Sequence, residues 1–167
     1  MIGSNDEQTM AQIFGQAIEI EIKAASMYKK YTELFSHIPE ISAFWRELTA
    51  DEMDHAKTLR AIHISLTEEQ LQVPCNSELL EKVVATRRML NNDLTASINN
   101  LDEAYELAHE LEFSEINAIF KFLAVKLVSN VEREQFIVSH IGQHQQKLLD
   151  FKSRFGDQAW RKGISTK

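Results

Sequence analysis

The sequence contains few of the residues that build disulfides, turns and membrane spans. Cys75 is the single cysteine among 167 residues, which excludes an internal disulfide, a CxxC zinc ribbon and an iron site with four thiolate ligands. Five glycines and two prolines are too few for the turns of an all-β fold, so long helices are favoured. No stretch approaches the roughly 20 apolar residues of a transmembrane helix. Residues 1–10 also lack the apolar segment of a secretory signal, and we expect a cytoplasmic protein without a membrane partner.

Positive charge is also scarce. The 18 lysines and arginines are outnumbered by 25 aspartates and glutamates, giving a net charge of −7. Nucleic acids and anionic membranes bind positive surfaces, so neither is an expected partner. Apolar residues make up 44% of the chain, which is enough for one core. We expect a single domain over residues 6–156, followed by a loosely held tail over 157–167.

Apolar residues recur at helical spacing in four long segments. We expect helices over 6–36, 39–65, 98–127 and 131–155, with Pro39 in the first turn of the second. Ser129 and Asn130 offer a cap for the fourth helix, and Gly156 ends it. Residues 67–100 form a long crossover with its own short helix, which starts at Asn76 or Ser77. The pattern predicts an all-α four-helix bundle of two hairpins.

Each predicted helix carries ionisable residues on its apolar face, where charge is costly unless it is compensated. The turn of the first hairpin lies midway in sequence between Glu21 and Glu52, and the turn of the second lies midway between Glu115 and His144. Equal distances from a turn place residues at one level of an antiparallel pair. The candidate ligands are Glu21, Glu52, His55, Glu112, Glu115, His140 and His144.

A bound cation is the simplest compensation for so many buried ionisable groups. Carboxylates and neutral imidazoles are ligands of iron, manganese and zinc. The Glu-x-x-His spacing of Glu52 and His55 sets two side chains on one helix face about 4.5 Å apart along the axis. Carboxylates can also bridge two ions. The pattern therefore predicts a dinuclear iron or manganese site.

Four motifs in order resemble the diiron domain of the rubrerythrins, in the ferritin-like superfamily. They are EIKAASMY with Glu21 and Tyr28, ADEMDHAKTL with Glu52 and His55, LEFSEINAIF with the paired glutamates, and HIGQHQQKL with His144. The resemblance covers roughly residues 8–155. It implies a ferritin-like bundle with a long crossover between the second and third helices.

The resemblance also implies an activity. Such proteins reduce peroxide, or oxidise ferrous iron with peroxide or dioxygen, at two iron ions, for which manganese or zinc can substitute. Glu115 or Glu112 would bridge the ions or swing between them, so Glu115 is the candidate catalytic residue. The sequence has no rubredoxin centre, so an external protein would donate the electrons. The fold commonly pairs, so we expect a homodimer.

One departure from the family pattern leaves alternatives open. Ile141 stands three residues before His144, where the family has a glutamate. His140 is either a substitute ligand or only a neighbour of the site. The chain is then a diiron oxidoreductase, a degenerate bundle that binds metal without turnover, or a purely structural protein whose site has decayed.

Overall fold

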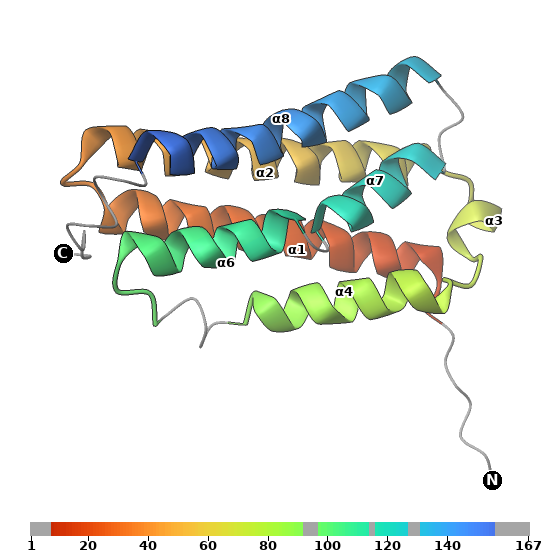
Figure 1. Ribbon diagram of the computed structural model, residues 1–167. Coiled ribbons are helices and arrows are strands. Elements are labelled where there is room, and N and C mark those ends of the chain that lie inside the picture. Colours follow the sequence, from red (N-terminus) through yellow and green to blue (C-terminus); the bar gives the residue numbers. More distant parts are fainter. Residues whose placement is uncertain (1–7, 92–96, 114–115, 127–130, 156–167) are drawn as a thin grey trace, which may run out of the picture.

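The chain folds into long helices that lie side by side. The computed structural model describes residues 8–91, 97–113, 116–126 and 131–155, and every regular element within them is a helix. Figure 1 shows the long helices running in roughly the same direction, with the crossover packed on one side. The expected all-α bundle is therefore confirmed. None of the described helices combines the length and the apolarity that a membrane span requires.

The first helix, α1 (Met10–Leu34), begins later than the apolar pattern alone predicts. Thr9 is its N-cap: the Thr9 hydroxyl accepts from the backbone N–H of Gln12, and the Gln12 side chain accepts from the backbone N–H of Thr9. This reciprocal pair satisfies two backbone donors that a helix start leaves open, and it fixes the boundary. The predicted start near residue 6 was wrong because that cap was not recognised.

The second helix, α2 (Pro39–Ser65), has the predicted bounds and runs antiparallel to α1. Ser42 Oγ donates to the carbonyl of Thr32 at 2.9 Å near the turn. Far from the turn, the Phe14 and His63 rings stack with their centroids 5.5 Å apart. Residues at equal distances from the turn therefore meet, as the hairpin prediction requires.

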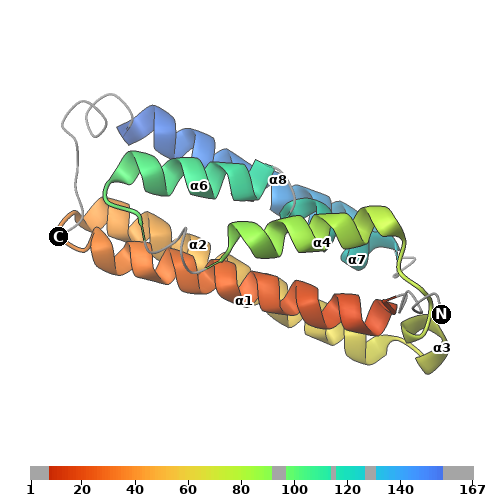
Figure 2. The same cartoon turned by 90° about the horizontal axis from the view of Figure 1, so that it is seen from below.

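The described residues of the crossover include two short helices, α3 (Glu68–Leu71) and α4 (Ser77–Met89). Asn76 is the N-cap of α4, and its side chain accepts from the backbone N–H of Leu79 at 2.8 Å. The Cys75 backbone N–H donates to the carbonyl of Gln8 at 2.7 Å and ties the crossover to the start of α1. In Figure 2, α4 lies alongside α1 and closes that side of the bundle.

The third long segment consists of two elements, α6 (Leu101–Phe113) and α7 (Ile116–Lys126), where the sequence predicts one helix. Residues 114–115 lie outside the described residues. Figure 1 shows α7 set at an angle to α6, so the two do not share one axis. The Asn100 side chain accepts from the backbone N–H of Glu103 at 2.9 Å. This bond caps α6 and explains why the helix begins three residues later than predicted.

The last helix, α8 (Val131–Phe155), is helical throughout the range predicted for it and returns along α7 and α6. Gln145 Nε2 donates to the carbonyl of Glu112 at 3.2 Å, and Lys152 Nζ lies 3.7 Å from Glu106 Oε1. These pairs are equally spaced about the second turn, so this hairpin is also antiparallel. The cap predicted at 129–130 and the stop predicted at 156 lie outside the described residues.

Candidate metal centre

Five ionisable side chains from four helices meet in one buried layer of the bundle. None is more than 2% exposed. These are five of the seven side chains that the sequence predicts as ligands: Glu21 on α1, Glu52 and His55 on α2, Glu112 on α6, and His144 on α8. The i, i+3 spacing on α2 turns Glu52 and His55 to the same side.

The first cluster joins α1 to α2. The ligand atoms of Glu21, Glu52 and His55 lie within 4.8 Å of one another. His55 Nδ1 is 3.3 Å from Glu52 Oε2 and 3.6 Å from Glu21 Oε2. Two carboxylates therefore face one imidazole nitrogen from neighbouring helices, in a space small enough for one metal ion to bind all three.

The second cluster joins α2 to α6 and α8. The ligand atoms of Glu52, Glu112 and His144 also lie within 4.8 Å of one another. His144 Nε2 is 3.3 Å from Glu52 Oε1, and His144 Nδ1 is 3.1 Å from Glu112 Oε2. Glu52 thus belongs to both clusters, with one oxygen toward each histidine. A carboxylate in that position can bridge two ions.

The donor set fits a pair of divalent cations. Several buried polar atoms beside the two clusters have no hydrogen-bond partner in the part of the chain that the structure describes: Glu21 Oε2, Glu52 Oε1 and both ring nitrogens of His144. Buried polar atoms are normally satisfied, and those left over point to a missing ion or water. Three carboxylates and two imidazoles match the ligand preference of iron and manganese.

Surrounding hydrogen bonds hold the Glu112 carboxylate in place. The Tyr28 hydroxyl donates to Glu112 Oε1 at 2.6 Å, and Asn117 Nδ2 donates to Glu112 Oε2 at 2.9 Å. Asn117 also donates to the Glu112 backbone carbonyl at 2.7 Å. Outer hydrogen bonds of this kind orient the groups that bind a metal. Glu112 is therefore the most constrained carboxylate of the layer.

Without a cation, protons balance the charge at the first cluster. Burial by itself lowers the pKa of His55, but hydrogen bonds and charges from Glu21 and Glu52 outweigh it and raise that pKa to about 11. Burial raises the pKa of Glu52 well above its usual range, and the nearby charge of Glu112 raises it further. His55 is thus protonated at neutral pH, and a metal ion would displace that proton.

The second cluster behaves in the same way. Burial acts to lower the pKa of His144, but the charge of Glu112 and the contact with its carboxylate raise it. Burial acts to raise the pKa of Glu112, but the charge of His144, the close contact with its ring and the hydrogen bond from Tyr28 lower it. The pair is held as carboxylate and imidazolium. The positive charge in this pair comes from the extra proton on the His144 ring, and a metal ion could replace that proton.

A comparison with protein families identifies the chain. The family model described as Rubrerythrin matches residues 12–136. This chain belongs to the rubrerythrin family. No curated protein and no solved structure matches the chain. The matched segment contains Glu21, Glu52, His55 and Glu112, and it ends before His144. The resemblance stated for the sequence and the ferritin-like fold that it implied are therefore confirmed.

Two further residues were predicted as ligands, and of these only His140 is among the described residues. Glu115, the candidate catalytic residue, lies outside the described residues. His140 is described and half-buried on α8, and its ring meets that of His55 edge-on with the centroids 5.2 Å apart. Burial lowers the pKa of His140, and the charge of His55 lowers it further. His140 is therefore a neighbour of the first cluster among the residues described.

The position three residues before His144 is apolar in this rubrerythrin. Ile141 is 9% exposed and packs in the hydrophobic core. The helical spacing turns it toward the same side as His144. The structure therefore has one carboxylate fewer at this position than the family motif supplies, and the second cluster depends on Glu52 and Glu112 for its negative charge.

The sequence did not single out Asp51, which approaches the second cluster from α2. Its Oδ2 lies 3.4 Å from His144 Nε2 and 2.6 Å from Lys147 Nζ. Asp51 immediately precedes Glu52, and Lys147 follows His144 by three residues. This proximity in the sequence was the signal from which an Asp51–Lys147 ion pair beside the predicted ligands could have been inferred. Asp51 adds negative charge beside His144, although Lys147 offsets part of it.

Proposed function

We propose that this rubrerythrin is a nonheme diiron oxidoreductase that reduces hydrogen peroxide. The observation that supports the proposal most strongly is that two buried clusters of ligand atoms share the Glu52 carboxylate. A dinuclear site can store two electrons, which is the number that peroxide reduction consumes. Iron would supply that redox capacity, and manganese in one position is the variant of the same proposal.

The reaction balances with an external reductant. Hydrogen peroxide accepts two electrons and two protons, its O–O bond breaks, and two water molecules form. The single cysteine rules out a four-thiolate iron centre within this sequence. We therefore propose that another protein donates the electrons. Pairing of the chain into a homodimer stays a prediction, which sedimentation velocity can test.

The residues of the chain have distinct roles in this proposal. Glu21 and His55 bind the first ion, Glu112 and His144 bind the second, and Glu52 lies between them. Tyr28 holds Glu112 through its 2.6 Å hydrogen bond. Burial of the whole layer excludes bulk water and strengthens each electrostatic contact. Glu115 stays the proposed group that changes position as the charge of the centre changes.

Ferrous iron is the second proposed source of electrons. Two Fe(II) ions and two protons would convert one peroxide molecule to two water molecules and leave two Fe(III) ions. Dioxygen is the alternative oxidant for the same ferrous substrate. Stopped-flow absorbance separates these branches, because a donor-linked peroxidase oxidises the added donor by two electrons per peroxide over many turnovers, whereas a ferroxidase oxidises two added ferrous ions per peroxide without any donor.

The direct test is turnover by protein loaded anaerobically with ferrous iron. Peroxide consumption is followed with an artificial electron donor, and bound iron is measured on the same sample. We expect consumption that scales with bound iron and is abolished in Glu52→Gln. A loaded protein that consumes no peroxide and oxidises no ferrous iron contradicts the proposal.

Ile141 supports a competing function, namely metal binding without turnover or a purely structural bundle. The core position that holds a carboxylate in the family motif is filled by an alkyl side chain. If the site has decayed, removing its charges relieves strain, and Glu52→Ala and His55→Ala fold as well as the wild type or better. If it binds metal, both variants lose the stabilisation that added metal provides.

A further inference from the structure

A small cavity borders the first cluster at His55. Its volume is about 240 Å³, and it lies between α2, α7 and α8. The walls include His55 and Thr58 from α2, Phe120 from α7, and Ile137 and His140 from α8. This is room for several water molecules, each of which takes about 30 Å³ in the liquid. It offers a way for a small molecule to reach the buried layer.

His55 connects this cavity to the candidate metal centre. Its Nδ1 faces the carboxylates of Glu21 and Glu52, and its ring stacks on Phe120 with the centroids 4.4 Å apart. The second ring nitrogen, Nε2, is buried and has no hydrogen-bond partner among the described residues. An imidazole that binds a metal through one nitrogen keeps a proton on the other. Its N–H would be available to an acceptor in the cavity.

A second imidazole lines the same cavity. The His140 ring meets the His55 ring edge-on, at 76° and 5.2 Å, and stacks with Phe136 at 6.0 Å. A neutral imidazole offers one hydrogen-bond donor and one acceptor. Thr58 contributes a hydroxyl that can do both. The polar groups of the cavity are thus few, and they are mixed donors and acceptors.

The composition of the walls favours an uncharged occupant. Phe120, Phe136 and Ile137 are apolar. The carboxylate of Asp54 also lines the cavity, but Lys57 Nζ lies 2.8 Å from it and offsets its charge. A small neutral molecule that both donates and accepts hydrogen bonds matches this lining. Hydrogen peroxide has those properties.

We propose that this cavity binds hydrogen peroxide beside the metal centre and that His140 positions it there by a hydrogen bond. The inference rests on the proposed function and deepens it by assigning the substrate site. It gives His140 a role that does not require it to bind metal. His140 is a substrate-positioning residue in this proposal.

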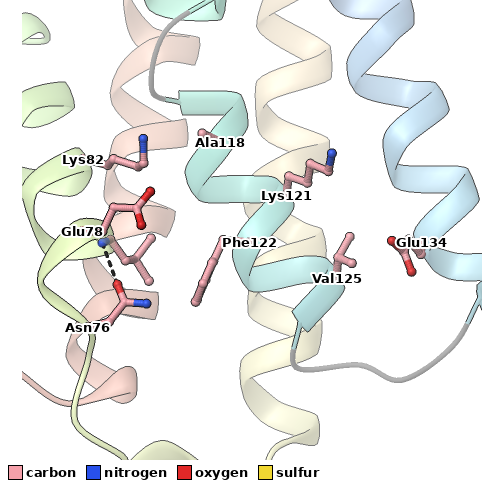
Figure 3. Close-up of a pocket in the computed structure, with 9 residues that line it drawn as sticks. Asn76, Glu78, Lys82, Ala118, Lys121, Phe122, Val125 and Glu134 are labelled. Carbon is pink, nitrogen blue, oxygen red and sulfur yellow. Dashed lines mark hydrogen bonds between the residues drawn. The ribbon is translucent and has the colours of Figure 1, made fainter.

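A larger cavity elsewhere in the bundle does not have these properties. It has a volume of about 530 Å³ and lies between α4, α7 and α8 (Figure 3). None of the five clustered side chains lines it. Apart from Asn76, its polar side chains are charged: Figure 3 shows two lysines and two glutamates among the lining residues. Those residues are useful as controls: Glu78, Lys82, Lys121 and Glu134.

The first experiment measures substrate binding without metal. Hydrogen peroxide is titrated into the metal-free protein, and the imidazole signals are followed by long-range ¹H–¹⁵N correlation spectroscopy. We expect saturable shifts of the His55 and His140 signals and none for His63, which lies at the far end of α2. Shifts that are absent or equal for all three histidines overturn the assignment of the cavity.

The second experiment uses iron-loaded His140→Ala, with His140→Asn as the conservative variant and Lys121→Gln as the control. We expect His140→Ala to keep the wild-type amount of iron and the wild-type kcat, while its KM for peroxide rises about tenfold, the effect of losing one hydrogen bond. His140→Asn, which keeps a donor and an acceptor, should recover most of the loss. Lys121→Gln should match the wild type.

The outcomes distinguish the inference from the proposed function. Loss of iron from His140→Ala makes His140 a ligand and overturns the positioning role. An unchanged KM overturns it as well. A wild type that consumes no peroxide refutes the proposed function, and the titration of the metal-free protein then still decides whether the cavity binds peroxide.

Discussion

The Tyr28 hydroxyl donates a 2.6 Å hydrogen bond to Glu112 Oε1, joining α1 to α6 across 84 positions of the sequence. Both side chains are fully buried. The pKa of Tyr28 is raised well above its usual range, first by burial and then by the charge of Glu112, so the phenol keeps its proton. Tyr28 is therefore a fixed donor that orients one carboxylate of the metal centre.

Tyr28→Phe removes that donor without changing the shape of the core. We expect the affinity for the ion held by Glu112 and His144 to fall about 10–100-fold, the usual effect of deleting an outer hydrogen bond. The ion held by Glu21 and His55 should bind as before. Cobalt titration followed by calorimetry resolves the two binding steps.

Tyr31→Phe is the matched control. The Tyr31 hydroxyl is buried on the same helix and has no hydrogen-bond partner among the described residues. Its removal should leave both affinities unchanged. Equal losses in the two variants would mean that the tyrosine hydroxyls act on the core in general, and the specific role of Tyr28 would be refuted.

The metal-free protein should become less stable as the pH rises from about 6.5 to 9. The pKa of His55 is about 11 in the folded state against an ordinary value of 6.5. Folding therefore takes up a proton in this range, so the stabilisation is complete below pH 6.5 and is lost as the pH approaches 11. For each proton that folding takes up, the free energy of unfolding falls by about 1.4 kcal/mol per unit rise in pH. Urea denaturation at several pH values measures the slope, and a stability that rises with pH contradicts it.

Metal binding should have the opposite dependence on pH. An ion must displace the protons from His55 and His144, whose pKa values are both raised in the metal-free protein. The apparent affinity for cobalt should therefore increase about tenfold per pH unit for each proton released. Calorimetry at pH 7 in buffers of different ionisation enthalpy counts those protons. A count of zero would contradict binding at the two histidines.

Ile141→Glu restores the carboxylate of the family motif. In the metal-free protein it adds a buried charge and should cost several kcal/mol of stability. Metal should recover that loss and bind more tightly at the second cluster. Ile62→Glu, seven residues beyond His55 on α2 and fully buried in the core, is the control that metal should not rescue. Thermal unfolding with and without cobalt compares them, and an Ile141→Glu that metal does not rescue counts against this position lying at the centre.

Helical periodicity was sufficient to predict most of the fold. Pro39 and Asn76 marked the starts of α2 and α4, and the structure has both boundaries where they were expected. The start of α1 was wrong because the cap at Thr9 lies inside the apolar pattern. The separation of α6 from α7 was also missed. No glycine or proline interrupts 101–126, and the axis of a helix depends on its neighbours more than on its own sequence.

Helical periodicity also made the layer of ionisable residues predictable, because Glu21, Glu52 and His144 interrupt apolar stripes at matching distances from the turns. The contacts that neighbouring side chains make with these residues from outside the stripes could not be predicted. Asp51 reaches His144 sideways, about 100° around α2 from Glu52, and Asn117 reaches Glu112 from the next helix. Periodicity gives the face of a helix that is buried, whereas such contacts depend on how the helices are rotated against one another.

The sharing of Glu52 by two ions is the central claim, and iron stoichiometry after anaerobic loading tests it most directly. Glu21 and Glu52 each contribute to the first cluster, but only Glu52 also belongs to the second. Glu19, exposed on α1 and paired with Lys23 at 3.0 Å, provides the control Glu19→Gln. We expect about two irons per chain in the wild type and in Glu19→Gln, about one in Glu21→Gln and almost none in Glu52→Gln. Two irons retained by Glu52→Gln would contradict the account.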